Sequence, residues 1–444
     1  MEYLLTQAVQ EESIEVLRDI ISIRSVLSES NIKEGAPFGL GIRKCLDRMI
    51  YLCNQLGMRT YIDEEGYYGY SEVGEGDELL VILCHLDVVP EGNLDEWMVD
   101  PYQLTIIDDK LYGRGTQDDK GPTIAALFGL KALMNQSITF KRRVRFVFGT
   151  DEENLWRCLD HYNQKEEQAT VGFAPDADFP LVYAEKGLLQ CYLIGPGAQE
   201  FQLHLDNPLN VVPDQAIYRG NKLDEIQESL AQTTYDYDLQ LDHIVVKGKS
   251  VHSKNAPEGI NAILGLIQVM NEHYDHPVLD FVSNKLTDPK GRLLFGNIKD
   301  DVSGTLTVNL ASLTMTEEQS RIGLDIRIPV QTNKETIVER LIKEGREYGL
   351  SYEEYDYLAS LYVPKESELV QTLLTVYRQL TGDQTEPLVS GGATFARTIH
   401  NCVAFGARMA DVPTTYHQIN ENMPLKNFYE AMEIYAHAIK KLAT

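Results

Sequence analysis

In the first part of the chain, segments with the hydrophobic periodicity of helices alternate with apolar segments that are typical of strands. Amphipathic stretches at 3–23 and 38–57 predict helices. The run LLVILCHLDVV at 79–89 is too uniformly apolar for a half-exposed strand and predicts a buried central one. A helical pattern follows at 121–133, and RVRFVFGT at 143–150 predicts another strand. This rhythm predicts an α/β fold with a central, mostly parallel sheet that is flanked by helices.

Strand-like patterns dominate after about residue 187. Helical patterns at 258–273 and 334–348 lie between them. The strand-like segments are 188–197, 243–247, 305–313 and 321–329. In the last of them apolar residues alternate with polar ones, which predicts a half-buried strand with Asp325 and Arg327 on its polar face.

Helical patterns return towards the C-terminus, first after residue 361 and then at 426–442. A chain of 444 residues also exceeds the usual size of one hydrophobic core. We therefore predict a discontinuous domain, 1–187 and 361–444, with an inserted α+β domain at 188–360.

Composition narrows the class of function. The formal net charge is −27, whereas nucleic-acid binding depends on clustered Lys and Arg, so neither nucleic acid nor an anionic membrane surface is an expected partner. No apolar run approaches the roughly 20 residues of a membrane span, and the first residues do not form a signal peptide. We expect a cytoplasmic protein whose six cysteines are buried, reduced thiols.

Acidic residues and histidines follow several predicted strands. His85 and Asp87 lie near the end of one, and the acidic run 151–153 follows another. The other candidates are Asp118, Asp119, Asp176 and His417. Ligands usually bind at the carboxyl ends of strands in α/β sheets, and imidazole and carboxylate groups together suit a zinc-like divalent cation.

Each of these signals also has a structural interpretation. A histidine after a strand is often a hydrogen-bonded structural residue. Asp118 and Asp119 could form a turn and a helix cap, the run 151–153 could be a solvated loop, and Asp176 could belong to a turn. The combination of the signals favours the metal site.

This combination resembles a known family. LCHLDVVP, YGRGTQDDKGP, GTDEEN, FAPDADFP and YHQINE are similar, in this order, to motifs of the di-zinc aminoacylase and carboxypeptidase superfamily of metallopeptidases. The similarity extends to GKSVHSKNAPEGINA, GLDIRIP and SGGATFARTIHNCVAFG, and so covers most of the chain. It is closest to the bacterial dipeptidase V branch, the Xaa-His or carnosinase-like dipeptidases.

The resemblance implies a site for two divalent ions, Zn²⁺ foremost, with Mn²⁺ and Co²⁺ as alternatives. Its ligands would be Asp118 as the bridge, His85 and Asp176 at one ion, and Glu153 and His417 at the other. Asp87 would orient the His85 imidazole through its second nitrogen. Glu152 would be the general base. A non-proline cis peptide between Asp118 and Asp119 is also implied.

The chemistry of amide hydrolysis explains these residue types. Two cations about 3.5–4 Å apart can bind one water, lower its pKa and polarise the substrate carbonyl. A carboxylate outside the ligand set then takes the water's proton and returns it to the leaving amine. Glu152 and Glu153 would divide these duties as base and ligand.

The inserted domain matches the family's lid. The resemblance implies that His252 stabilises the oxyanion with Asn210 beside it, and that Arg327 holds the substrate's terminal carboxylate. Gly391 and Gly392 would supply backbone donors at the carboxylate pocket. Without the resemblance, Asn210 is a turn residue, Arg327 forms an ion pair on a strand surface, and the glycines form an ordinary turn.

Several positions depart from the family pattern. Asn154 and Leu155 stand where relatives carry Ser-Gly, Ala393 replaces a third glycine, and Phe395 replaces a tyrosine. Because leucine tolerates positive φ poorly, we expect the substrate side of the site near Glu153 to be reshaped. These changes bear on substrate preference more than on reaction type.

The sequence therefore predicts a metal-dependent dipeptidase, of Xaa-His type or of broad specificity, that acts on small peptides. An N-acyl amino acid deacylase of the same fold is the alternative, since it uses the same metals. An inactive binding protein is a third, although all five ligands and Glu152 are present. The insert is long enough to imitate both halves of the lid dimer of simpler relatives. We therefore predict a functional monomer, in which His252 closes over the chain's own metals.

Overall fold

The computed structural model describes residues 3–444, which form two compact units. The first unit comprises the chain up to Tyr183 together with Tyr362–Leu388 and Thr394–Thr444. The second comprises Ala184–Leu361 and Val389–Ala393. These limits lie a few residues from the boundaries predicted at 187/188 and 360/361. The segment Val389–Ala393 differs from the prediction, because it belongs to the second unit.

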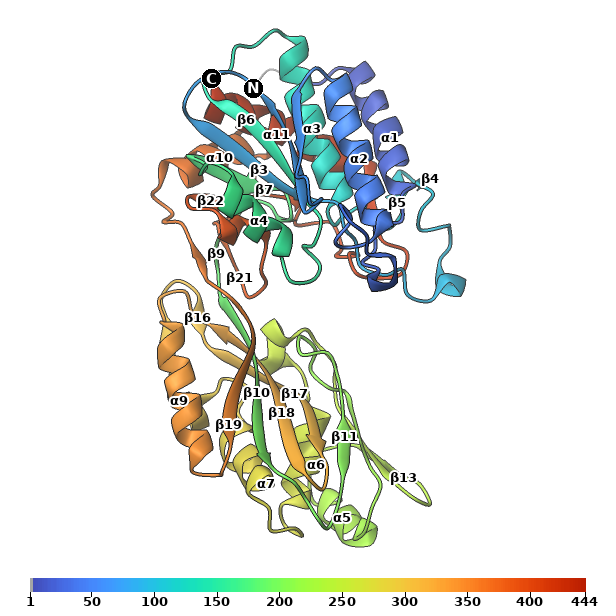
Figure 1. Ribbon diagram of the computed structural model, residues 1–444, viewed down its shortest axis with the longest axis vertical. Coiled ribbons are helices and arrows are strands. Elements are labelled where there is room, and N and C mark those ends of the chain that lie inside the picture. Colours follow the sequence, from blue (N-terminus) through green and yellow to red (C-terminus); the bar gives the residue numbers. More distant parts are fainter. Residues whose placement is uncertain (1–2) are drawn as a thin grey trace. The chain divides into compact units, whose positions relative to one another are not determined.

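The first unit contains most of a large mixed sheet with the strand order β1-β2-β6-β3-β7-β22-β9-β20, and with β21 paired to β9 (Figure 1). The strands β9, β20 and β21 each include residues of the second unit. Its strands are β1 (Arg59–Ile62), β2 (Tyr68–Val73), β3 (Leu79–His85), β6 (Arg143–Gly149), β7 (Val171–Ala174), β9 (Val182–Glu185), β20 (Leu361–Tyr362), β21 (Leu388–Ser390) and β22 (Cys402–Ala404). The central strands β6, β3, β7 and β22 run parallel, whereas β1, β2 and β9 pair antiparallel. The predicted fold class is confirmed.

Helices flank this sheet. They are α1 (Gln7–Ile21), α2 (Leu40–Gln55), α3 (Lys120–Asn135), α4 (Arg157–Lys165), α10 (Glu368–Thr381) and α11 (Leu425–Ala443). Helix α3 is almost wholly buried and packs against α1 and α11. Because helices cover the sheet, all residues of β3 are buried, which explains its uniformly apolar sequence.

Small sheets complete the first unit close to the acidic loops. One is formed by β4 (Thr105–Ile107), β5 (Lys110–Tyr112) and β24 (Asn422–Pro424), and the other by β8 (Ala177–Asp178) and β23 (Ala407–Arg408). The pairing of β24 with β5 brings a late segment of the chain beside the segment that leads into α3.

The second unit is α+β. Its main sheet is antiparallel, with the order β11-β17-β18-β10-β19, and a smaller sheet has the order β12-β14-β13. The strands are β10 (Gly187–Pro196), β11 (Leu203–Leu205), β12 (Gln215–Tyr218), β13 (Tyr237–Leu239), β14 (Ile244–Lys247), β15 (Lys299–Asp300), β16 (Gly304–Thr305), β17 (Thr307–Met315), β18 (Gln319–Ile328) and β19 (Ser351–Leu358). The helices are α5 (Leu223–Leu230), α6 (Ala262–Met270), α7 (Pro277–Phe281), α8 (Arg292–Phe295) and α9 (Lys334–Arg346). One apolar core joins these elements.

Two predicted elements of the second unit differ from the structure. The segment 321–329 is not half-buried: β18 lies between β10 and β17, and its charged residues Asp325 and Arg327 are only 1% and 2% exposed. The helix predicted at 258–273 is shorter, because the side chain of Asn261 caps α6 by accepting from the backbone N–H groups of Ile263 and Leu264.

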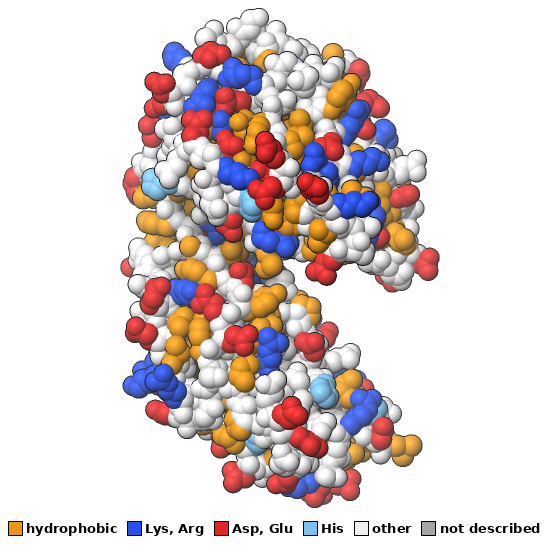
Figure 2. All heavy atoms as spheres, viewed as in Figure 1, with side chains coloured by type: hydrophobic (Ala, Val, Ile, Leu, Met, Phe, Trp, Pro, Cys, Tyr) orange, Lys and Arg blue, Asp and Glu red, His pale blue; other side chains and the backbone are white. Residues whose placement is uncertain are grey.

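Surface and membrane properties are consistent with the composition. On the visible face of each unit, side chains of both signs are interspersed, and no continuous basic stripe appears on that face (Figure 2). Among the helices of residues 3–444, none combines the length and the hydrophobicity that a membrane span needs. The six cysteines all lie within the described chain and are buried and free of disulfides, as predicted.

Candidate metal centre

Three neighbouring strands of the large sheet deliver acidic or imidazole groups to one edge. His85 is the last residue of β3, Glu152 and Glu153 follow β6, and Asp176 follows β7. Since β6, β3 and β7 are adjacent and parallel, their carboxyl ends lie together. Asp118 joins them from the turn before α3.

The side chains predicted as ligands meet in two groups that share Asp118. His85, Asp118 and Asp176 offer ligand atoms within 4.8 Å of one another, and so do Asp118, Glu153 and His417. His85 Nε2 lies 2.8 Å from Asp118 Oδ1, whereas His417 Nε2 lies 3.0 Å from Asp118 Oδ2. The two oxygens of one carboxylate therefore face two separate sets of donors, which is the arrangement of a bridging ligand.

The spacing within each group fits a small divalent cation. His417 Nε2 is 3.0 Å from Glu153 Oε2, and His85 Nε2 is 3.8 Å from Asp176 Oδ2. Ligand atoms at about 2.0–2.2 Å from a tetrahedral zinc ion are separated by roughly 3.3–3.6 Å. The observed separations, from 2.8 to 3.8 Å, bracket this range.

The negative charge of these buried carboxylates also favours the binding of cations. Burial raises the pKa of Asp176 well above its usual range, and the nearby Asp118 carboxylate raises it further. Burial, followed by the charge of Asp118, likewise raises the pKa of Glu153. Burial opposes the ionisation of Asp118 too, but hydrogen bonds from His417 and His85 lower its pKa overall. Such mutual repulsion among buried carboxylates is relieved by divalent cations.

The peptide bond between Asp118 and Asp119 is cis, as predicted. The Asp119 carboxylate turns inward, where its Oδ2 accepts hydrogen bonds from the backbone N–H of His85, at 3.2 Å, and from Thr123 Oγ1, at 3.0 Å. Consecutive aspartates thus point in different directions, one towards the imidazoles and one into the protein.

Asp87 contacts His85 differently from the prediction. The Nδ1 atom of His85 lies 2.9 Å from the main-chain oxygen of Asp87, but 3.6 Å from its carboxylate, too far for a hydrogen bond. The carboxylate instead accepts from the backbone N–H groups of Glu152, at 3.1 Å, and Glu153, at 3.0 Å. Asp87 therefore orients the imidazole through its carbonyl and the two glutamates through its side chain.

The loop that follows β6 is stabilised by contacts of Trp156 and Arg157. Trp156 Nε1 donates to the main-chain oxygen of Glu152 at 2.6 Å, and Arg157 forms a two-point ion pair with Asp151. The positive φ of this loop falls on Trp156, at 59°, and not on Leu155, which is 46% exposed. The strain expected at Leu155 is therefore absent from the described loop.

Burial raises the pKa of the Glu152 carboxyl well above its usual range, and the charge of Glu153 adds to the effect.

Phe395, at the position where relatives carry tyrosine, contacts two rings edge-on. Its ring centre lies 6.2 Å from that of His85 and 5.4 Å from that of Trp156. The His85 imidazole is thus held against an apolar wall.

In the second unit, the segments that contain Asn210 and His252 lie side by side. Val211 forms a β-bridge with His252, and the backbone N–H of Ser253 donates to the carbonyl of Asn210 at 2.8 Å. Both Asn210 and His252 are exposed. Asn309 supports the first segment, because its Nδ2 donates to the main-chain oxygen of Val211 at 2.8 Å.

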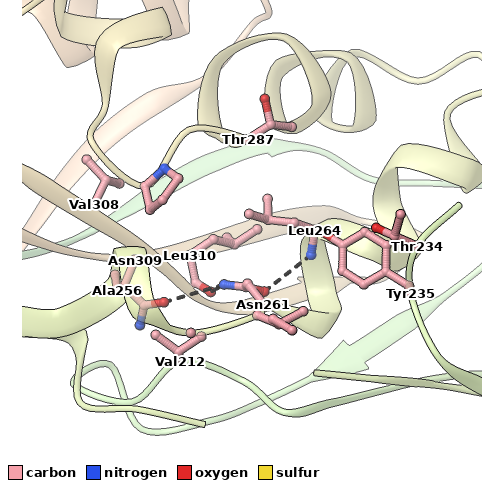
Figure 3. A pocket seen from close by; sticks show the side chains of 13 residues that line it. Val212, Thr234, Tyr235, Ala256, Asn261, Leu264, Thr287, Val308, Asn309 and Leu310 are labelled. Carbon is pink, nitrogen blue, oxygen red and sulfur yellow. Dashed lines mark hydrogen bonds between the residues drawn. The ribbon is translucent and has the colours of Figure 1, made fainter. Parts of the chain in front are cut away.

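Behind these segments lies a pocket of about 290 Å³ (Figure 3). Val212, Asn261 and Asn309 are among the residues that line it. The Nδ2 of Asn261 donates to the main-chain oxygen of Leu310, and its Oδ1 caps α6. The polar groups of Asn261 are thus engaged within the protein, and the pocket walls are otherwise largely aliphatic.

Arg327 is paired within the second unit. Its Nε and Nη2 contact the two oxygens of Asp325 at 2.7 and 2.9 Å. Nη2 also donates to Ser253 Oγ, and Nη1 donates to the main-chain oxygen of Gly391, both at 2.9 Å. These contacts use four of the five N–H groups of a guanidinium. The ion pair considered for Arg327 exists, but it is buried, not on a surface.

Replacement of Asp325 by alanine is expected to destabilise the protein by about 3–5 kcal/mol, because it leaves the buried Arg327 charge without its partner. Denaturant unfolding, monitored by circular dichroism, measures the change. Asp238→Ala is the control: Asp238 pairs with Lys247 at the surface of the same unit, and such pairs contribute about 0–1 kcal/mol. Equal losses in both variants would contradict a special role for the buried pair.

The two glycines predicted to donate to a substrate carboxylate have partners in the second unit. The carbonyl of Gly391 accepts from Arg327, and the backbone N–H of Gly392 donates to Ser390 Oγ at 2.9 Å. A Cβ atom on Gly391 would lie 2.8 Å from the Cβ of Lys254, which explains why glycine is needed there.

Sequence reasoning missed several residues that organise these sites. Arg114, Gln117 and Glu421 are buried beside Asp118, and Ser253 is buried beside Arg327. All of them lie within the motifs quoted for the resemblance. The sequence signal that could have identified them is a charged or amide side chain close in sequence to a predicted ligand, within a loop that contains glycine.

Comparison with known proteins settles the family. Residues 81–441 match the model of Peptidase family M20/M25/M40. The chain belongs to this family. It is therefore a hydrolase of peptide bonds, and its family is one that depends on two metal ions.

Relatives in sequence and structure match nearly the whole length of the chain. A Staphylococcus aureus protein (strain NCTC 8325) named "Putative dipeptidase" is 34% identical over 98% of both chains, as is one from Staphylococcus haemolyticus. Human carnosine dipeptidase 1 superposes with a TM-score of 0.62 at 15% identity, over 97% of this chain and 96% of that one. An M20 metallo-carboxypeptidase from Sulfolobus solfataricus does so with 0.62 at 19%, over 97% and 98%. These structural similarities support the fold.

Proposed function

We propose that this member of the family is a dipeptidase that hydrolyses small peptides at a two-metal site. The observation that carries the proposal is the position of Asp118, whose two oxygens each face a different imidazole. The names of the relatives that are 34% identical support the substrate class. The ligand set is His85, Asp118, Glu153, Asp176 and His417.

These ligands would hold two divalent cations, Zn²⁺ foremost since His and carboxylate ligands suit it, and the cations would lower the pKa of a bound water and polarise the substrate carbonyl. Glu152 lies beside the ligands without being one of them. It accepts the proton of the attacking water and passes it to the leaving amine. Burial raises the pKa of its carboxyl, which makes Glu152 a stronger base for this proton than an exposed glutamate.

Asp87 keeps Glu152 in place during this exchange. Its carboxylate binds the backbone N–H groups of both Glu152 and Glu153, which fixes the base relative to the ligand beside it. Trp156 binds the Glu152 carbonyl from the other side. The loop can therefore hold the base steady while its proton comes and goes.

The second unit supplies the groups that recognise the substrate in this proposal. His252 donates to the oxyanion that develops on the carbonyl oxygen, with Asn210 beside it. Arg327 binds the terminal carboxylate of the dipeptide through its remaining N–H group, and the backbone of Gly391 and Gly392 shapes that pocket. We further propose that the chain works as a cytoplasmic monomer, so that His252 serves the metals of its own chain.

The test is an assay of the purified protein with dipeptides, tripeptides and N-acyl amino acids. We expect hydrolysis of dipeptides that include Xaa-His, complete loss of activity on dialysis against a chelator, and recovery on addition of Zn²⁺, Mn²⁺ or Co²⁺. Dipeptides with a blocked amino or carboxyl end serve as controls and should be poor substrates. Hydrolysis of N-acyl amino acids alone would show a deacylase instead.

A further inference from the structure

A buried carboxylate holds the loop that contains Asp118 to the loop that contains His417. This residue, Glu421, lies four positions after His417 and has no solvent exposure. Its Oε1 accepts hydrogen bonds from the backbone N–H groups of Gln117, at 2.8 Å, and of Asp118, at 3.3 Å. Glu421 therefore contacts the backbone of the bridging aspartate directly.

The other oxygen of Glu421 faces a second pair of donors. Arg114 Nη1 lies 2.8 Å from Oε2, and the backbone N–H of Gly115 lies 3.1 Å from it. Arg114 is itself only 2% exposed, and its Nη1 also donates to the main-chain oxygen of Gln418, the residue after His417. Its guanidinium carbon lies 5.3 Å from the ring centre of Trp97. The negative charge is thus neutralised by a cation that is fixed in the same place.

The side chain of Gln117 also contacts the loop that contains His417. Its Oε1 accepts from the backbone N–H groups of Thr415, at 2.9 Å, and Tyr416, at 3.2 Å. Its Nε2 donates to the main-chain oxygens of Pro413, at 3.0 Å, and Asn422, at 2.9 Å. One side chain therefore meets four backbone groups of the segment that surrounds His417.

We propose that Glu421, together with Arg114 and Gln117, positions Asp118 against His417 so that the site of the second ion is formed before an ion binds. This inference rests on the proposed function only in taking these two residues as metal ligands. Residues 118 and 417 are far apart in sequence, and neither lies in a helix or strand that would hold it. The buried side chains replace that missing regular structure.

A carboxylate is required at position 421 because all four of its partners are donors. In Glu421→Gln an amide nitrogen replaces one oxygen, so that in either orientation an NH₂ group faces two donors. The expected result is a loss of 10–100-fold in affinity for an ion, the usual effect of removing a group that holds a metal ligand.

Glu433→Gln provides a matched control. Glu433 is also a buried carboxylate of the first unit, at 5% exposure, and accepts from the backbone N–H groups of Leu4, at 2.7 Å, and Leu5, at 3.1 Å. The substitution likewise turns an NH₂ group towards a backbone donor, beside His437, whose Nε2 lies 3.1 Å from Glu433 Oε1, at a place that holds neither loop. It should therefore destabilise the protein without an effect on the metals.

The experiment titrates Co²⁺ into metal-free wild type and both variants, by calorimetry and by the visible spectrum of the bound ion. We expect wild type and Glu433→Gln to bind two ions alike, and Glu421→Gln to bind one of them 10–100-fold more weakly with an altered spectrum. Excess Co²⁺ should restore much of its kcat. Unchanged affinity and spectrum in a folded Glu421→Gln would overturn the proposal.

Gln117→Met keeps the proposal testable if Glu421→Gln does not fold. Methionine has a similar length and removes the four bonds to the second loop, so that the affinity for one Co²⁺ ion should again fall. Unchanged binding by this variant would refute the role of Gln117. Wild type that binds two ions but hydrolyses no peptide would contradict the proposed function and leave this inference standing. Wild type that binds no Co²⁺ would overturn both.

Discussion

Replacement of Glu152 by glutamine is expected to lower kcat by about 10²–10⁴-fold, since that is the usual contribution of a general base. Glutamine has nearly the same shape, and the contacts that fix this loop come from the backbone of residues 152 and 153 to Asp87. The loop should therefore keep its conformation. Metal content, measured by atomic emission after dialysis, should remain at the wild-type value.

Glu153→Gln is the matched variant, one position along the same loop. Glu153 lies 3.0 Å from His417, and loss of its charge should weaken the binding of one ion. Activity should then depend on the concentration of added metal, in contrast to Glu152→Gln. If both variants lost metal to the same extent, the division into base and ligand would be wrong.

Replacement of His252 by alanine is expected to lower kcat by about 10²–10³-fold, the effect of removing one donor to an oxyanion. His252 is exposed, and its Nδ1 accepts from the backbone N–H of Lys254 at the start of a short turn. Folding should therefore be little affected. Steady-state kinetics and thermal unfolding of the variant measure the two effects separately.

A mixture of Glu152→Gln and His252→Ala decides which chain the histidine serves. In a functional monomer each molecule lacks one essential group, so the mixture should be no more active than its components. Glu152→Gln mixed with wild type is the control for simple dilution. Recovery of activity in the first mixture would place the histidine in the active site of a second chain and would contradict the proposed monomer.

The sequence determined the class of the fold and the identity of the metal-ligand candidates. The strand that ends at His85 was predictable because both faces of the parallel sheet are covered, which makes its sequence uniformly apolar. The strand that ends at residue 149 is almost wholly buried as well, although it includes Arg143 and Arg145. The convergence of His85 and the acidic run 151–153 followed from the same alternation, since parallel strands end at one edge, whereas the place of Asp176 in the site followed from the resemblance. The cis peptide at Asp118 followed from the resemblance alone.

Only the tertiary structure decided which partner each polar group has. The alternation in the strand at 321–329 predicted an exposed face for Arg327. A short segment does not reveal that Ser253 and Gly391 cover that face. The spacing of Asp87 from His85 suggested a contact between their side chains. The Asp87 carboxylate instead binds backbone N–H groups that come from another strand's loop.

The physical reason is the range of the forces concerned. Hydrophobic periodicity is a local property, because it reflects which face of one element is buried, and it can be read along a few turns or a single strand. A buried charge is stable only with partners that the whole fold brings to it. Glu421 and Asp118, about three hundred positions apart in the chain, are brought into contact by the tertiary fold. The sequence thus identified the candidate acidic and histidine side chains of this protein, and the tertiary structure determined which of them lie in contact.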